Sequence, residues 1–212
     1  HLGGRCDDLP AAHDIVLCDR GGLDAADDRV YIPRHLVEGA LRTANRNVTL
    51  YSRDGRCDLD LRTRRVHLGT GGAAVLVLDL ESGRTRHSTL RDLYDIGRLV
   101  DTLDNTHFYL RPVVARDVDS DVIDVNTFYA ALAGTTKHVM GGCYFPAKVA
   151  ELKRLAVTIA GGEEAFLARP FMSLNLCYSV SPLRFAEETT ETLTAAVRAG
   201  FPVAIVSAPL AG

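Results

Sequence analysis

The chain has 212 residues, of which 47% are hydrophobic and 24% are charged, and its formal net charge is −3. This balance is typical of an ordinary globular protein with a sizeable core. Lysine and arginine are scattered along the chain, and no apolar run approaches the roughly 18 residues that span a bilayer. The composition therefore argues against nucleic acid and against a membrane as partners.

The cysteines predict the cellular location of the protein, and the chain ends predict whether the sequence is a fragment. Five cysteines stand at wide, irregular spacings without a Cys-x-x-Cys pair, which favours a reducing, cytoplasmic location. The start at His1 shows no secretion signal. Because the chain begins without methionine and stops directly after an apolar run, we expect it to be the N-terminal part of a longer protein.

The first part of the chain predicts a helix and a small antiparallel sheet. After an irregular start, Pro33 opens a helix, since proline favours the first helical position. Two pairs of short alternating runs follow, 48–51 with 57–61 and 73–80 with 85–87. Each pair is joined by a glycine-containing turn, which is typical of a β-hairpin.

From Thr89 onwards the pattern changes to alternating strands and helices. Thr89 and Asp92 have the spacing of a capping box, and apolar residues then recur at helical intervals. Strand-like runs about thirty residues apart begin near four positions: Phe108, Lys137, Phe171 and Pro202. Helical patterns lie between them, including one after Pro146 that ends at Gly161 and one after Arg184 that includes Phe185 and ends at Gly200.

Repeating βα units of this length predict a parallel sheet, either open or part of an eight-fold barrel. No Gly-x-Gly-x-x-Gly or Walker-type glycine motif follows any strand, which favours the barrel. We therefore predict an α/β fold, a partial (β/α)8 TIM-type barrel with an N-terminal helix and small antiparallel β subdomain. Residues 1–88 would form the N-terminal subdomain, and residues 89–212 the first half of the barrel, whose C-terminal half is missing.

Several segments, in order and spacing, resemble the trimethylamine methyltransferase family of corrinoid-dependent enzymes. They are residues 29–37, 78–86, 92–93, 134–138, 180–183, 200–203 and 207–212. The resemblance implies a methyltransferase that moves a methyl group from a tri- or quaternary methylamine, of the trimethylamine or glycine betaine type, to a corrinoid protein. It implies that the corrinoid (cobalamin) is carried by this partner and is not bound directly. It further implies a homo-oligomer in the full-length form, and we expect the fragment alone to be inactive.

In barrels the working residues stand at the C-terminal ends of strands and in the loops that follow. Those positions are Arg111, Asp117, His138, Cys143, Asn175, Cys177, Ser179, Ser181 and Ser207. Lys137, at the start of its strand, is expected at the opposite, stabilising end. His138 is the candidate catalytic residue because its ordinary pKa lies near neutrality. The alternative for His138 is a strand histidine held by hydrogen bonds.

The candidate substrate-binding residues are polar or aromatic side chains near these strand ends: Asp117, Tyr144, Asn175, Tyr178, Ser181 and Ser207. The asparagine and the serines can bind a carboxylate or an amide, and Asp117 can stabilise an ammonium ion. Tyr109, Tyr144 and Tyr178 can surround a quaternary amine through cation–π contacts. The alternatives are turn and capping roles for the polar residues and core packing for the tyrosines.

Two other functions remain open from the sequence. His138, Cys143 and Cys177 lie near the ends of neighbouring predicted strands, and a His/Cys/Cys set could bind zinc in a barrel methyltransferase that acts on a thiol. Their spacing matches no tight zinc motif, so no metal site is predicted. The chain could also be a non-catalytic binding or assembly module that pairs through the open edges of its sheet.

Overall fold

The computed structural model describes residues 22–24, 29–62, 64–180, 184–185 and 187–208. The chain divides into two compact units, His1–Asn47 and Val48–Gly212. The two predicted hairpins beyond residue 48 belong to the same unit as the parallel sheet. The boundary between the two compact units, after Asn47, therefore lies earlier in the chain than the expected boundary at residue 88.

The described residues of the first unit form one hairpin and one helix. Strand β1 (Gly22–Asp24) pairs antiparallel with β2 (Arg29–Tyr31), and α2 (Arg34–Thr43) follows. The expectation of an irregular start was wrong for this hairpin, because strands of three residues are too short to show an alternating pattern. Pro33 is the N-cap of α2, one position before the predicted place.

The second unit begins with a short segment that we call the amino-terminal cap, residues 48–62. Its strands β3 (Thr49–Leu50) and β4 (Leu59–Asp60) pair antiparallel with Leu50 opposite Leu59, which confirms the predicted hairpin. Both leucines are buried. Ser52 ties the turn together, since its backbone N–H and its hydroxyl both donate to the Asp58 carboxylate.

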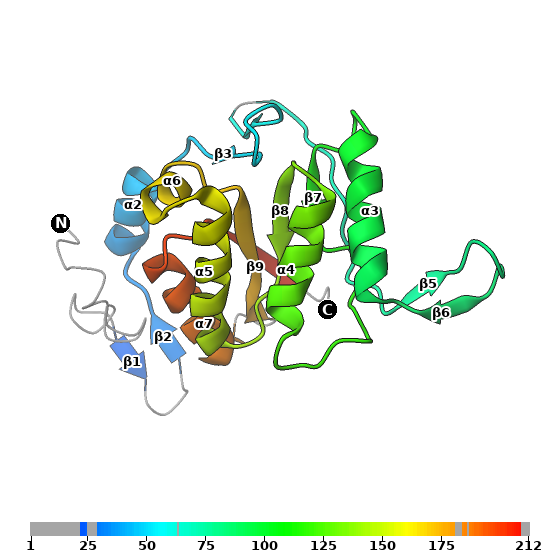
Figure 1. The fold of residues 1–212 in the computed structure, drawn as a ribbon. Coiled ribbons are helices and arrows are strands. Elements are labelled where there is room, and N and C mark those ends of the chain that lie inside the picture. Colours follow the sequence, from blue (N-terminus) through cyan, green and yellow to red (C-terminus); the bar gives the residue numbers. More distant parts are fainter. Residues whose placement is uncertain (1–21, 25–28, 63, 181–183, 186, 209–212) are drawn as a thin grey trace. The chain divides into compact units, whose positions relative to one another are not determined.

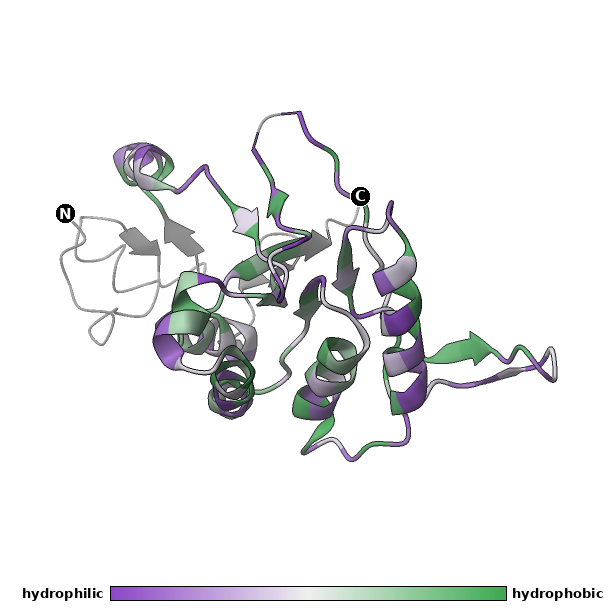
Figure 2. Ribbon diagram, turned by 45° about the horizontal axis from the view of Figure 1, so that its top comes forward, coloured by the Kyte–Doolittle hydropathy of each residue, from purple (hydrophilic) through white to green (hydrophobic). Residues whose placement is uncertain are grey.

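A second hairpin projects from the second unit, and it too was predicted. Strand β5 (Leu76–Leu78) pairs antiparallel with β6 (Thr85–His87), and Figure 1 shows the pair extending away from α3. Figure 2 shows that β5 is hydrophobic, although two of its side chains, Leu76 and Leu78, are exposed to solvent. An ion pair from Arg86 to Asp79 (3.0 Å) lies within the hairpin, and one from Arg86 to Asp92 (2.7 Å) joins the hairpin to the start of α3.

A parallel sheet forms the centre of the second unit. Its strands are β7 (Phe108–Leu110), β8 (His138–Gly141), β9 (Met172–Val180) and β11 (Val203–Ala208). Each strand pairs with the one before it in this order, and β10 (Arg184–Phe185) adds antiparallel to β9. All four predicted strand starts are correct to within one residue. The described strands do not close into a barrel.

Helices alternate with the parallel strands, as the sequence predicted. They are α3 (Leu90–Thr102), α4 (Ile123–Gly134), the short η2 (Pro146–Lys148) leading into α5 (Val149–Ala160), α6 (Glu163–Ala168) and α7 (Glu187–Arg198). The capping box of Thr89 and Asp92 is present at α3. The short elements α6 and β10 were not expected, and Phe185, predicted to belong to the last helix, lies in β10. No helix in the described part of the chain is long and apolar enough to cross a membrane.

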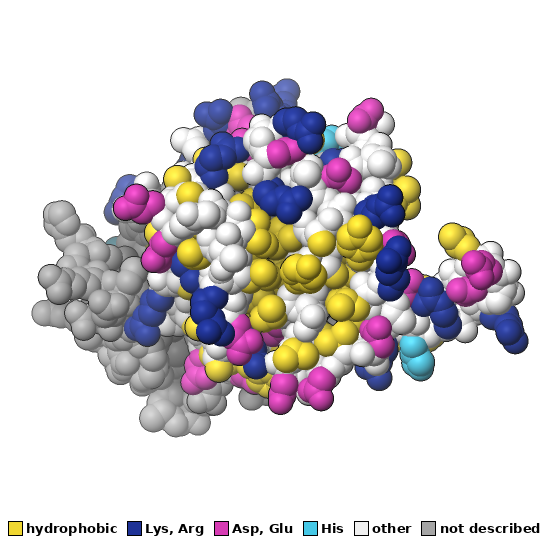
Figure 3. Space-filling view, viewed as in Figure 1, with side chains coloured by type: hydrophobic (Ala, Val, Ile, Leu, Met, Phe, Trp, Pro, Cys, Tyr) yellow, Lys and Arg dark blue, Asp and Glu magenta, His cyan; other side chains and the backbone are white. Residues whose placement is uncertain are grey.

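The core lies between the sheet and the helices. Helices α3, α4 and α5 lie on one side of the strands in Figure 1, and α7 contacts β9, η2 and α5. Apolar residues from both layers are buried, among them Leu93 of α3, Phe128 of α4 and Leu174 of β9. Figure 3 shows that hydrophobic side chains also gather on the outer face over α4, where Tyr129 is exposed. The helices thus cover one face of the sheet.

Two glycines let α3 and α4 approach closely. A Cβ built on Gly134 would lie 2.6 Å from the Tyr94 carbonyl oxygen and 3.1 Å from the Gly97 Cα. Real Cβ atoms do not approach backbone atoms so closely, so the two helices can pack at this distance only because both positions lack side chains. The contact fixes where α4 ends and therefore where β8 begins.

We expect Gly134→Ala to lower the free energy of unfolding by roughly 1–3 kcal/mol, the usual cost of overpacking a rigid contact. Urea denaturation followed by circular dichroism measures it. Gly39→Ala is the matched control in a helix, because an added Cβ there meets only the flexible end of Arg42. The control should be neutral or stabilising by up to about 1 kcal/mol. Equal stability of the two variants would contradict the close helix contact.

Candidate functional site

The register of the parallel strands brings a pocket together at their carboxyl ends. Leu110 pairs with Met140, and Gly141 pairs with Leu174, so the residues that follow these pairs stand side by side. The pocket has a volume of about 210 Å³ and is lined by Gly72, Ala73, Leu110, Arg111, Gly142 and Asn175. It lies at the edge of the sheet where βα proteins hold their ligands. Arg111 and Asn175 were predicted at this edge.

Arg111 supplies the charge of the pocket. Its backbone N–H donates to the Met140 carbonyl (2.9 Å), which holds the residue at the end of β7 beside β8. Its guanidinium carbon lies 5.4 Å from the centre of the Tyr144 ring, within cation–π range. No ion pair to Arg111 occurs among the described residues. The guanidinium is thus available to an anion.

The rest of the lining combines an amide with open backbone. The Asn175 Oδ1 is buried and has no hydrogen-bond partner among the described residues. A Cβ on Gly142 would lie in ordinary contact with both neighbours, 3.6 Å from an Arg111 nitrogen and 3.8 Å from the Asn175 backbone carbonyl oxygen. Ala73 has a positive φ of 49°, a conformation that costs free energy in a residue with a side chain.

A buried carboxyl group supports the loop beside the pocket. The Asp124 side chain of α4 is buried, and its Oδ2 accepts from the Tyr144 N–H (3.0 Å). Burial raises the Asp124 pKa, although the nearby positive charges of Arg111 and Lys148 oppose the rise. Burial also raises the pKa of the neighbouring Cys143 to about 12, so this thiol stays protonated at neutral pH. The pair positions Tyr144 and offers no nucleophile.

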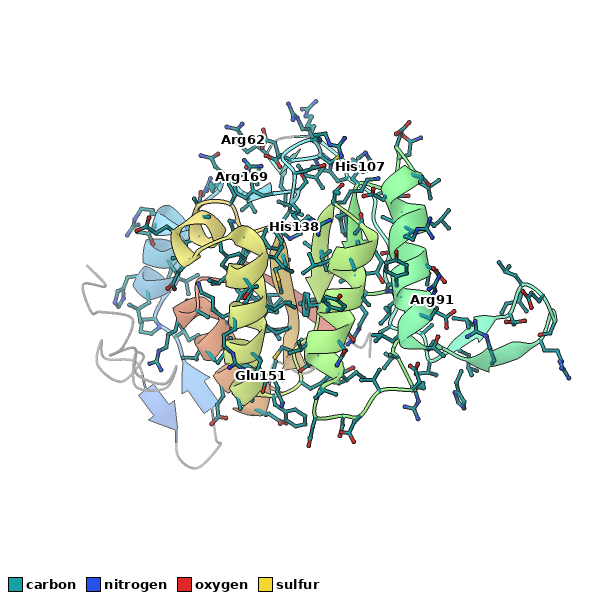
Figure 4. The ribbon with its side chains drawn as sticks, viewed as in Figure 1. Arg62, Arg91, His107, His138, Glu151 and Arg169 are labelled. Carbon is teal, nitrogen blue, oxygen red and sulfur yellow. The ribbon has the colours of Figure 1, made fainter. Side chains whose placement is uncertain are left out.

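His138 lies at the other end of the sheet, and its expected position was wrong. It is the first residue of β8, whereas it had been placed near the carboxyl end. Figure 4 shows it beneath the amino-terminal cap. Its Nδ1 lies 2.9 Å from the Tyr51 carbonyl, to which it must donate, and its Nε2 then accepts from the Ser173 hydroxyl (2.9 Å). These contacts agree with the alternative interpretation of His138, a strand histidine held by hydrogen bonds.

Lys137 lies at this amino-terminal edge as predicted. Its buried Nζ donates to the carbonyls of Val100, Leu103 and Thr106, each at 2.7 Å. These carbonyls stand at the end of α3 and just after it, where helices leave acceptors unpaired. Lys137 therefore stabilises the fold and is remote from the pocket.

We expect His138 to make stability depend on pH. Burial lowers its pKa from 6.5 to about 4, so the unfolded chain binds a proton first as the pH falls. The stabilisation is complete above pH 6.5 and is lost between pH 6.5 and 4, by on the order of 3 kcal/mol. Urea denaturation at several pH values measures it. His138→Gln should remove this part of the pH dependence; an unchanged slope would contradict the assignment.

The remaining predicted residues fall into two groups. Asp117 accepts from the Leu90 N–H (2.8 Å), so it caps the start of α3 and does not line the pocket. Tyr109 is fully buried and donates to the Leu93 carbonyl, so it belongs to the core and cannot surround an amine. The side chains predicted at Tyr178, Ser179, Ser181 and Ser207 lie outside those the structure describes. Only Arg111, Tyr144 and Asn175 come together.

The proposed zinc ligands do not come together. His138 begins β8, and Cys143 follows its end, a separation on the order of 10 Å or more along an extended chain. Zinc requires all its ligands within about 2.3 Å of the ion. Cys177 is exposed, and the described residues contain no cluster of three potential ligands. This histidine and these cysteines therefore cannot form one zinc site.

The sequence analysis missed Asp124 and most of the pocket lining, namely Gly72, Ala73, Leu110 and Gly142. Asp124 carried a signal, since it is an isolated acid in the largely apolar stretch 123–134, and such an acid is often buried for a reason. Gly72 and Ala73 carried none. They reach the pocket because Ala74 bridges to Val113 after β7, a long-range contact that no local pattern encodes.

These features define an α/β protein of parallel βα units with a ligand pocket at the carboxyl edge of its sheet. A family model described as "Trimethylamine methyltransferase (MTTB)" matches residues 9–212, and the chain belongs to this family. The predicted resemblance is confirmed.

Curated relatives agree with the family assignment. The chain is 32% identical to trimethylamine methyltransferase MttB of Desulfitobacterium hafniense, over 86% of this chain and 37% of the relative. It is 25% identical to a glycine betaine methyltransferase of the same species (91% and 40%), and 29% identical to MttB of Methanosarcina barkeri (86% and 38%). The chain thus spans about two fifths of the length of these relatives.

Proposed function

We propose that the protein is a methyltransferase that takes a methyl group from a tri- or quaternary methylamine and passes it to a corrinoid protein. The observation that carries this proposal is the pocket at the carboxyl edge of the sheet in a chain of this family. The names of the relatives, trimethylamine and glycine betaine methyltransferases, supply the class of methyl donor.

We also propose that the parallel sheet is the first half of a (β/α)8 barrel. The strand order follows the chain order, from β7 through β8 and β9 to β11. Helices α3, α4 and α5 cover one face only (Figure 1), whereas open doubly wound sheets carry helices on both faces. The uncovered face, which carries Met140 and Asn175, would then be the barrel interior.

The lining of the pocket contains no histidine, carboxyl or thiol side chain. Its residues are glycines, alanine, leucine, arginine and asparagine. A quaternary ammonium needs no protonation, because its nitrogen leaves as a neutral amine when the carbon–nitrogen bond breaks. The chain would therefore contribute binding and orientation, which supply much of the rate of such transfers.

A volume of about 210 Å³ suits a small amine and is too small for a corrin ring. The corrinoid would thus be presented at the mouth of the pocket by a partner protein. When bound there, its reduced cobalt supplies the electron pair that accepts the methyl group. We further propose a cytoplasmic location, which the wide and irregular spacing of the cysteines favours.

The full-length protein mixed with reduced cobalamin and a methyl donor should form methylcobalamin, which the visible spectrum reports. Trimethylamine, tetramethylammonium and glycine betaine form the donor panel. A donor-dependent spectral change is the expected result, and it names the substrate.

A family member with established activity serves as the positive control. If that enzyme forms methylcobalamin and this protein forms none with any donor of the panel, the proposed function is wrong. A non-catalytic binding or assembly role then becomes the better account.

A further inference from the structure

We infer that the pocket at the carboxyl edge is an anion subsite in which Arg111 binds the carboxylate of a zwitterionic methylamine. The inference rests on the proposed function and narrows its substrate class. It selects donors that carry both a quaternary ammonium and a carboxylate, such as glycine betaine, over simple amines such as trimethylamine.

Arg111 differs from the other arginines of the chain. Every other arginine whose side chain the structure describes is exposed to solvent, whereas Arg111 is half-buried. Several exposed arginines, such as Arg86 and Arg169, pair with carboxylates. Arg111 pairs with none in the described part of the chain, and its guanidinium lies over the Tyr144 ring. A half-buried cation without an ion-pair partner is costly, so its place at the wall of a pocket indicates an anion that arrives from outside.

The surroundings of Arg111 suit a carboxylate. The guanidinium presents a planar fork of N–H donors that matches the two carboxylate oxygens. Asn175 lines the same pocket, and its amide can donate a further hydrogen bond. Gly142 lies between these two residues. A Cβ there would contact an Arg111 guanidinium nitrogen and the Asn175 backbone carbonyl oxygen, so a larger side chain would take up part of this space.

The buried Asp124 does not take this role of counter-ion. It lies outside the lining of the pocket, and its Oδ2 is engaged by the Tyr144 N–H. Its distance from the Arg111 guanidinium exceeds that of an ion pair. The net charge that the pocket offers a ligand is therefore positive.

This charge discriminates between methylamines. A simple ammonium ion would meet the Arg111 cation in a small pocket with no carboxylate in its lining, and like charges repel. A zwitterion neutralises Arg111 with its carboxylate and leaves its methylated nitrogen free to face the mouth. The same chemistry would also bind a phosphate group, such as one on the side chain of a corrinoid, so phosphate must be tested separately.

Titration calorimetry on the full-length protein tests the inference with four probes: glycine betaine, tetramethylammonium, acetate and inorganic phosphate. We expect wild type to bind glycine betaine more tightly than tetramethylammonium. Arg111→Gln should weaken glycine betaine binding by roughly 10- to 100-fold, the usual loss for a hydrogen-bonded charge, and leave tetramethylammonium no weaker. Arg111→Lys, which keeps the charge without the fork, should lose less.

Arg154→Gln is the matched control, because Arg154 is an exposed arginine on α5 in the helix layer. It should bind every probe as wild type does, and circular dichroism should show all variants folded. The inference is overturned if wild type binds no glycine betaine, if it prefers tetramethylammonium, or if Arg111→Gln binds glycine betaine normally. It is also overturned if phosphate alone depends on Arg111, which would point to the corrinoid. If Arg111→Gln does not fold, Arg111→Lys decides.

The two proposals fail in different ways. Binding of glycine betaine that depends on Arg111, without methylcobalamin formation from any donor, would support the anion subsite and refute the proposed function. Methyl transfer from trimethylamine as fast as from glycine betaine, with no effect of Arg111→Gln on their ratio, would support the function and refute the subsite.

Discussion

The register between the parallel strands is the constraint on which the rest of the structure depends. Phe108 pairs with His138, and Val139 pairs with Met172, so each strand is aligned with the next along its length. A shift by one residue would turn every side chain to the other face of the sheet. With this register, Arg111, Gly142 and Asn175 meet at one edge, and the pocket follows from the pairing.

The two edges of the sheet have different roles. At the amino-terminal edge, His138 joins the cap to β9, and Lys137 satisfies the carbonyls at the end of α3. Both side chains are buried and fully occupied by the protein. At the carboxyl edge, Arg111 and Asn175 have capacity for hydrogen bonds that the described residues do not use. Groups that are committed to the fold are thus separated from groups that are free to bind.

Much of the fold could be predicted from the sequence. The long helices show a clear helical period, and the strand-like runs recur about thirty residues apart. Short elements such as β1, β10 and α6 could not, since a few residues show no period. At the site, Arg111 and Asn175 followed from their places after strands. His138 was misplaced although the start of its strand was predicted to within one residue, because it was assigned to the carboxyl end of a strand that is only four residues long. Gly72 reached the pocket through tertiary pairing alone.

The central claim is that this pocket holds the methyl donor by its carboxylate. The most direct measurement is a crystal structure of the full-length protein with glycine betaine bound. The account predicts the carboxylate oxygens at about 3 Å from the Arg111 guanidinium nitrogens, with the trimethylammonium group turned away from that charge. Glycine betaine bound elsewhere, or bound here with its ammonium group toward Arg111, would contradict it.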